Sequence, residues 1–186
     1  LGTVSVSRAR RGKGHSRHGV HDRGCPVPGR DVTEADGVPV TTLARTVVDL
    51  ARELPFDWGV AAADAALRAG LERGELEEQV ERSRRWPGNS RARAVVSFAD
   101  ARAESPGESR SRAIFAQAGL PAPSLQFPVW VDGVLVGRTD FGWEDRGVLG
   151  EFDGMVKYGA LVRPGESPAD ALAREKARED RLRAAG

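Results

Sequence analysis

Residues 138–157 read RTDFGWEDRGVLGEFDGMVK, and this stretch decides how the second half of the chain folds. Polar and apolar residues alternate on both sides of a central EDRG run, whose residues are typical of turns. The pattern predicts two antiparallel strands, 138–143 and 148–153, joined by a tight turn. With the turn centred on the EDRG run, Trp143 lies opposite Val148.

Three carboxylates share one face of this predicted hairpin. Because successive side chains point to opposite faces of a strand, Asp140, Glu151 and Asp153 fall together, with Asp140 opposite Glu151. Directly opposed like charges repel, and a shared proton or a bound cation would relieve the repulsion. Mg²⁺ prefers such oxygen ligands. The face is therefore either a metal site for phosphodiester chemistry or a solvated surface on which Arg138 pairs with Asp153. Spacing alone leaves both interpretations open.

The length of the chain fits one large domain or two small ones. The chain has 186 residues, a net charge of +1 and one cysteine. Residues 1–30 are strongly basic, although the whole chain is not. A lone Cys25 excludes an internal disulfide framework, so we expect a cytoplasmic protein. No apolar run is long enough for a membrane span, so no membrane partner is expected. The first residue, Leu1, indicates a fragment or a trimmed product.

The first 42 residues carry strand and loop signals. Alternation over residues 4–7 is weak, and residues 8–19 form a basic, glycine-rich stretch that predicts a mobile loop. Residues 32–41 predict a hairpin, because Asp36-Gly37 suits a type I′ turn. Three histidines lie within seven residues but lack the neighbours that a metal shell needs. We interpret them as solvated loop residues: His15, His18 and His21.

The middle of the chain is helical. Apolar residues recur at helical spacing and predict helices over 43–54, 56–69, 75–85 and 90–100. Five arginines flank Trp86 in sequence, and they form either a phosphate-binding track with one stacking ring or an ordinary charged surface. These arginines are Arg82, Arg84, Arg85, Arg91 and Arg93.

A strong helix start at Ser105 opens the second half. Ser105 is a favourable N-cap, and Glu108 follows three residues later. Glu108 can complete this capping box, or it can reach the acidic face if the helix, 105–118, packs over the hairpin. A strand at 125–131 precedes the hairpin, and a helix from Ser167 ends the chain. The resulting order is helix, three strands, helix.

The chain also resembles a known group of proteins. The segments SPGESRSRAIFAQAGLPAPSLQFPVWV, GRTDFGW, GVLGEFDGMVKY and EKAREDRLRAAG are similar to endonuclease-domain proteins related to very-short-patch-repair endonucleases, which belong to the PD-(D/E)XK superfamily. The preceding GVPVTTLARTVVDLAREL is similar to AbiEi-type antitoxin regulators. The resemblance implies an α+β chain. Residues 1–100 would be an AbiEi-like β and helical region, incomplete at its N-terminus. Residues 101–186 would be a restriction-endonuclease-like α-β-β-β-α core that lacks its last strand.

The resemblance also implies roles for particular residues. Glu108 matches the first-helix acid, Asp140 the first metal ligand and Glu151 the second acid. Asp153 stands where the superfamily usually has lysine, and Lys157 is the candidate substitute. Mg²⁺ or Mn²⁺ would be held by Asp140, Glu151 and Asp153. The departure at Asp153 leaves open a carboxylate-rich site or a nuclease-like fold without its basic group.

The implied function is metal-dependent hydrolysis of DNA phosphodiester bonds. Basic residues of the first half would contact DNA phosphates, namely Arg8, Arg10, Arg11, Lys13 and Arg85. The alternative is a non-catalytic, DNA-binding, antitoxin-like transcriptional regulator that keeps a nuclease-like scaffold. The antitoxin resemblance further implies a toxin as a partner.

Overall fold

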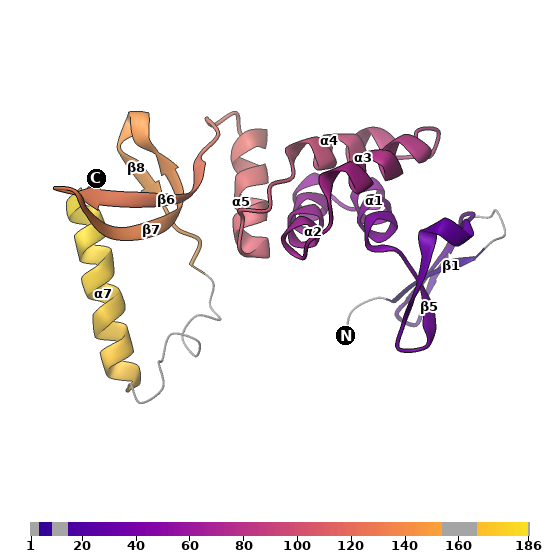
Figure 1. The fold of residues 1–186 in the computed structure, drawn as a ribbon, viewed down its shortest axis with the longest axis horizontal. Coiled ribbons are helices and arrows are strands. Elements are labelled where there is room, and N and C mark those ends of the chain that lie inside the picture. The colour runs from indigo at the N-terminus through magenta and orange to yellow at the C-terminus, as the bar shows by residue number, and fades with distance from the viewer. Residues whose placement is uncertain (1–3, 9–14, 154–166, 186) are drawn as a thin grey trace.

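The computed structural model describes residues 4–8, 15–153 and 167–185 (Figure 1). The first half contains β1 (Val4–Arg8), β2 (His15–Arg17), β3 (Val20–Gly24), a short 3₁₀ turn (Gly29–Asp31), β4 (Val32–Ala35), β5 (Val38–Thr41), α1 (Leu43–Glu53), α2 (Phe56–Arg68), α3 (Arg73–Arg82) and α4 (Asn89–Phe98). The second half contains α5 (Pro106–Gln117), β6 (Ser124–Val131), β7 (Val134–Trp143), a 3₁₀ turn (Glu144–Arg146), β8 (Val148–Gly150) and α7 (Pro168–Ala185). The predicted α+β class is confirmed.

Two small sheets form the N-terminal end. The predicted hairpin is present as β4–β5, and Asp36 and Gly37 have φ angles of +51° and +78°, as a type I′ turn requires. The loop predicted over residues 8–19 is wrong in its second part, because residues 15–17 form a strand against β3. The reason is the His18-Gly19 pair, whose positive φ angles make a second tight turn.

Helices α1 to α4 form a bundle with its own apolar core. Thr42 caps α1, since its Oγ1 accepts a hydrogen bond from the backbone of Arg45. Apolar side chains from all four helices meet inside and are fully buried, among them Val48, Val60, Leu76 and Val95. The four predicted helices are confirmed, with ends shifted by a few residues.

Helix α5 lies between this bundle and the sheet of the second half, β6–β7–β8 (Figure 1). Its Ala113 is part of the bundle core. On the sheet side, the Phe115 ring lies 5.3 Å from that of Phe141 and 5.5 Å from that of Trp143, both in edge-to-face geometry. The helix that the sequence places in the second half therefore packs against both halves.

Strands β6, β7 and β8 form an antiparallel sheet in that order. The pairing of Trp143 with Val148 confirms the predicted register, but β8 ends at Gly150 rather than at residue 153. Helix α7 packs beside β6 and β7 through Leu182, which approaches Gly137. The predicted order of helix, three strands and helix is thus present. Among the residues that the structure describes, no helix is long and apolar enough to cross a membrane.

Candidate active site

Asp140 lies on the central strand β7, next to the end of β8. Its Oδ2 accepts a hydrogen bond from the backbone amide of Phe152, with an N–O distance of 2.7 Å. The last registered pair of these strands is Phe141 with Gly150, so the following residues, Asp140 and Glu151, are neighbours where the ladder ends. The backbone amide thus holds the Asp140 carboxylate against the residue that follows Glu151.

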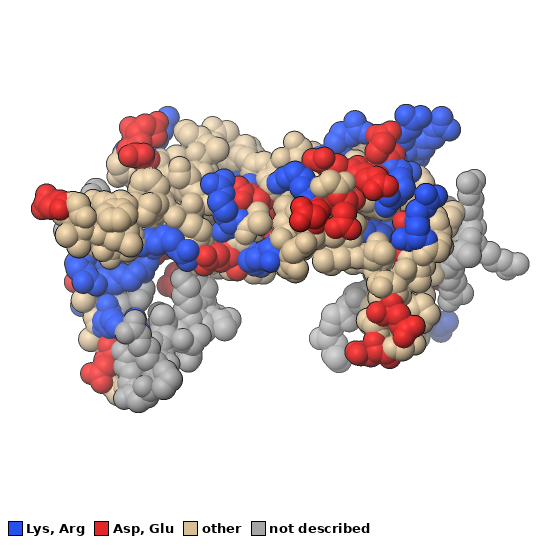
Figure 2. Space-filling view, in the orientation of Figure 1, with Lys and Arg blue, Asp and Glu red and all other residues tan. Residues whose placement is uncertain are grey.

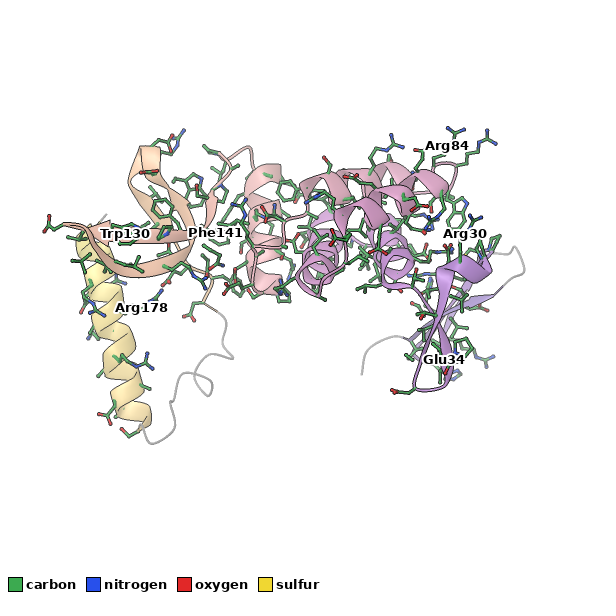
Figure 3. The ribbon with its side chains drawn as sticks, in the orientation of Figure 1. Arg30, Glu34, Arg84, Trp130, Phe141 and Arg178 are labelled. Carbon is green, nitrogen blue, oxygen red and sulfur yellow. The ribbon has the colours of Figure 1, made fainter. Side chains whose placement is uncertain are left out.

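Glu151 pairs with an arginine from the last helix. Arg178 Nη2 lies 2.5 Å from Glu151 Oε1, and Nη1 lies 3.4 Å from Oε2. The same Nη2 donates to the carbonyl oxygen of Arg138 at 2.7 Å. Figure 3 shows Arg178 beside the strands, on the side where α7 approaches them. A guanidinium therefore offsets the negative charge that the sequence placed next to Asp140.

Glu108 is buried where α5 begins. Its Oε2 accepts hydrogen bonds from the backbone amide of Glu104 and from Nε2 of Gln126, both at 2.8 Å. The Ser105 hydroxyl caps α5, and the Glu108 side chain instead joins the backbone just before the helix to β6. Gln126 lies between Leu125 and Phe127, which pair with Phe141 and Thr139, so Gln126 is across from Asp140.

Gln126 was not expected from the sequence. Its φ angle of +52° is rare for a residue other than glycine. Such conformations persist only where the surroundings hold them, and they cluster at functional sites. Its side chain contacts Glu108 of α5, and the strand register places it nearest Asp140, whose next neighbour along the sheet is Glu151. We call Glu108, Gln126, Asp140 and Glu151 the polar row, after their order over α5, β6, β7 and the end of β8. A single glutamine in an apolar strand gives no sequence signal of this kind.

The remaining predicted site residues are not part of this polar row, and one of them lies outside the described residues. Asp153 is exposed, and Lys157 lies outside the described residues. The predicted pair of Arg138 and Asp153 is wrong, because Arg138 Nη2 pairs with Glu104 at 2.9 Å. Asp153 does not come opposite Arg138, because β8 ends at Gly150, before the register that would pair them.

Carboxylate oxygens at Asp140 and Glu151 suit a hard divalent ion, since two carboxylates with water complete its usual shell. Within the described ranges, no three His, Cys, Asp or Glu side chains gather as a metal site. The predicted third ligand, Asp153, is thus not brought into a cluster with Asp140 and Glu151, and the metal site stays a prediction. His18 is exposed, and His21 lies 3.6 Å from the carboxylate of Glu53.

Few of the predicted DNA contacts can be placed. Arg10, Arg11 and Lys13 lie outside the described residues, and the structure describes only the backbone of Arg8. Arg85 is exposed in the turn between α3 and α4.

Trp86 is not an open stacking ring. The guanidinium carbons of Arg45 and Arg52 lie 4.5 and 4.9 Å from its centre. Arg45 is fully buried and also binds the carboxylates of Asp31 and Asp49, each at 2.8 Å. Burial lowers the pKa of Arg45, but the hydrogen bonds and negative charge of these partners, Asp49 above all, outweigh burial and raise it. Trp86 therefore packs on two arginines of α1, and it also lines an open pocket with His21 and Arg23 of β3.

Basic side chains gather at this end of the molecule. Figure 2 shows them over α3 and α4, with acidic side chains among them. Arg84 and Arg93 are 59% and 64% exposed, and both approach Glu81, at 3.5 and 3.7 Å. We call Arg84, Arg85 and Arg93 the basic turn. The other two arginines that the sequence singled out, Arg82 and Arg91, are also exposed but donate hydrogen bonds to Gln79 and to the carbonyl of Leu54.

Two curated proteins of Mycobacterium tuberculosis are similar to this chain. They are the uncharacterized protein Rv2248 of strain H37Rv and the uncharacterized protein MT2308 of strain CDC 1551. Each is 35% identical over 159 residues, which is 85% of this chain and 56% of the relative. The chain thus spans about half the length of the curated relatives it matches. No protein-family model matches the chain, and no solved structure does so significantly.

Proposed function

We propose that this chain is the DNA-cleaving part of a metal-dependent endonuclease. The observation that carries the proposal is the position of the Asp140 carboxylate, which a backbone amide holds at the end of β8, next to Glu151. Glu108 and Gln126 extend the polar row to α5. One carboxylate from each of two neighbouring strands, with a third acid from the preceding helix, is the order that the sequence resemblance implies.

The chemistry is addition of water across one P–O bond of the DNA backbone, so that the leaving alcohol takes up a proton. A bound Mg²⁺ would polarise the phosphate and acidify a water molecule. In this chain, Asp140 and Glu151 would supply its carboxylate ligands. Glu108 is held by Gln126 and by the backbone of Glu104, just before its helix, so its role in the proposal is to fix Gln126 across from Asp140.

The basic turn is the proposed contact with DNA outside the acidic site. Its three arginines are exposed, and exposed guanidinium groups bind phosphate oxygens without reading sequence. The neighbouring Arg91 donates instead to the carbonyl at the end of α1, that of Leu54 at 3.1 Å. This guanidinium group therefore joins α4 to the end of α1.

A non-catalytic DNA-binding regulator is the second candidate. Two observations favour it: Arg178 neutralises Glu151, and Asp153 stands where a lysine is usual. A scaffold without metal would keep such an ion pair. The regulator would bind DNA equally well with or without Mg²⁺.

Metal binding separates the two functions. Mn²⁺ is titrated calorimetrically into the wild type and into Asp140→Asn, which keeps an oxygen for the Phe152 amide but loses the charge. Asp145→Asn removes an exposed carboxylate from the turn of the same hairpin and is the matched control. We expect the wild type and the control to bind Mn²⁺ and to nick supercoiled plasmid with Mg²⁺, and Asp140→Asn to do neither. Equal binding and cleavage by Asp140→Asn would exclude the assigned site, and DNA binding without any Mn²⁺ binding would favour the regulator.

A further inference from the structure

We propose that Arg178 of α7 is the cationic group of the candidate active site. It holds Glu151 when no metal is bound, and it contacts the scissile phosphate once a divalent cation takes Glu151. This inference rests on the proposed function, because it assigns a residue to the same site. The resemblance includes the segment EKAREDRLRAAG of α7 but assigns no role to Arg178.

The contacts of Arg178 place it in the candidate active site. Arg178 approaches both carboxylate oxygens of Glu151 and also donates to the carbonyl oxygen of Arg138, on the strand that carries Asp140. A single guanidinium therefore joins α7 to the middle of β7 and to the residue that follows β8. It lies beside the carboxylates proposed to hold the metal, and its side chain is 26% exposed, so solvent and a substrate can reach it.

Among the described residues, no lysine stands where the resemblance would place the cationic group. The position two residues after Glu151 is Asp153, not a lysine, and Asp153 is exposed. Phosphate hydrolysis develops negative charge on the phosphate oxygens, and a fixed cation stabilises it. A guanidinium is suited to this task because its planar set of donors matches two phosphate oxygens as well as two carboxylate oxygens.

A consequence is that Arg178 and a divalent cation compete for Glu151. Removal of the arginine should therefore tighten metal binding while it weakens cleavage. A residue that only stabilised the fold would lower both. The opposite signs of the changes in metal affinity and in cleavage therefore distinguish the proposed role from a structural one.

The test compares Arg178→Gln with Arg138→Gln in the whole chain. Arg138 is the matched control, because it lies on β7 but pairs with Glu104 in an ion pair whose members are about half exposed. The side chains of Arg178 and Glu151 are 26% and 30% exposed, and a partly exposed ion pair is worth about 1 kcal/mol at most, so we expect Arg178→Gln to raise the Mn²⁺ affinity about two- to fivefold. Cleavage of supercoiled plasmid should fall, and the control should keep the wild-type Mn²⁺ affinity.

An unchanged or lower Mn²⁺ affinity in folded Arg178→Gln would overturn the inference, and so would undiminished cleavage. If Arg178→Gln does not fold, Arg178→Lys replaces it. One ammonium group cannot serve both oxygens of Glu151 and the Arg138 carbonyl, so the same two changes should appear at smaller size, and their absence would overturn the inference too. Failure of the proposed function is recognised separately, because then Asp140→Asn binds Mn²⁺ like the wild type.

Discussion

Arg112 of α5 and Asp64 of α2 form an ion pair in the interior, with 2.9 Å between Nη2 and Oδ2. The Asp64 side chain is fully buried, and that of Arg112 is 9% exposed. Asp64 also accepts a hydrogen bond from the backbone of Asp100 at 2.6 Å, and Arg112 donates to the carbonyl of Phe98 at 2.8 Å. The pair therefore joins α5 to the bundle through both partners.

Loss of this pair should destabilise the whole chain. Asp64→Ala leaves the charge of Arg112 buried without its carboxylate, and such a loss costs about 3–5 kcal/mol in the free energy of unfolding. Glu81→Ala, which removes the exposed partner of Arg84 and Arg93, is the control and should cost at most about 1 kcal/mol. Urea unfolding measures both changes. A loss below about 1 kcal/mol for Asp64→Ala would show that the pair does not hold α5 on the bundle.

The stability that Asp100 contributes near neutral pH should be lost in acid. The hydrogen bond from Arg102 lowers the pKa of Asp100, although burial acts in the opposite direction. A carboxyl group whose pKa is lower in the folded chain stabilises the fold above its unfolded pKa, and the contribution disappears as the pH falls through the folded value. Asp100→Asn should therefore be less stable than the wild type near neutral pH. The difference should shrink in acid, below the ordinary value of 3.8.

Thermal unfolding across a pH series measures this difference. Asp145→Asn is the control, since its carboxylate is largely exposed on the hairpin turn. Because Arg102 is 66% exposed, added salt should also reduce the effect of Asp100→Asn. A stability difference that stays constant from neutral pH into acid would contradict the assigned ion pair.

Local chemistry was sufficient to predict most of the helices and strands. The helix predicted over residues 105–118 occupies Pro106–Gln117, because its N-cap and first-turn proline are local signals. Trp143 pairs with Val148 as predicted, because a short turn fixes the register of a hairpin. Asp36-Gly37 makes the expected turn because the positive φ angles that this turn needs suit few other residues.

The features that the sequence did not reveal depend on long-range contacts. Arg178 meets Glu151 across 27 positions of the chain, and Arg112 meets Asp64 across 48. Neither arginine differs in local pattern from the many others in the sequence. The β2 strand was missed because the turn before β3 uses a histidine at positive φ, where asparagine or aspartate is the usual signal.

Gly88 is required where α4 begins. Its φ angle is +77°, and a Cβ atom there would lie 2.4 Å from the carbonyl oxygen of Arg52. Gly133, in the turn between β6 and β7, has a similar φ of +76° but open space around it, and so it is the matched control. Gly133→Ala should cost about 1–2 kcal/mol for the backbone conformation alone. Gly88→Ala should cost clearly more, because the Arg52 backbone must also move. Equal losses in urea unfolding would show that the close approach to Arg52 is not rigid.

DNA binding through the basic turn should be visible in its salt dependence. Each phosphate contact releases counterions and adds about 0.9 to the slope of log affinity against log salt concentration. If Arg84, Arg85 and Arg93 each contact one phosphate, their replacement together by alanine should reduce the slope by roughly 3 and should weaken binding at low salt most. Fluorescence anisotropy with a labelled duplex, in the absence of divalent ions, measures this slope.

Arg146→Ala removes an exposed arginine from the turn before β8 and is the control. Because neither variant changes Asp140 or Glu151, the Mn²⁺ affinity should stay at the wild-type value in both. A wild-type slope in the triple variant would exclude the basic turn as the DNA contact and would leave the phosphate contacts to residues 8–13 or to the arginines of α7.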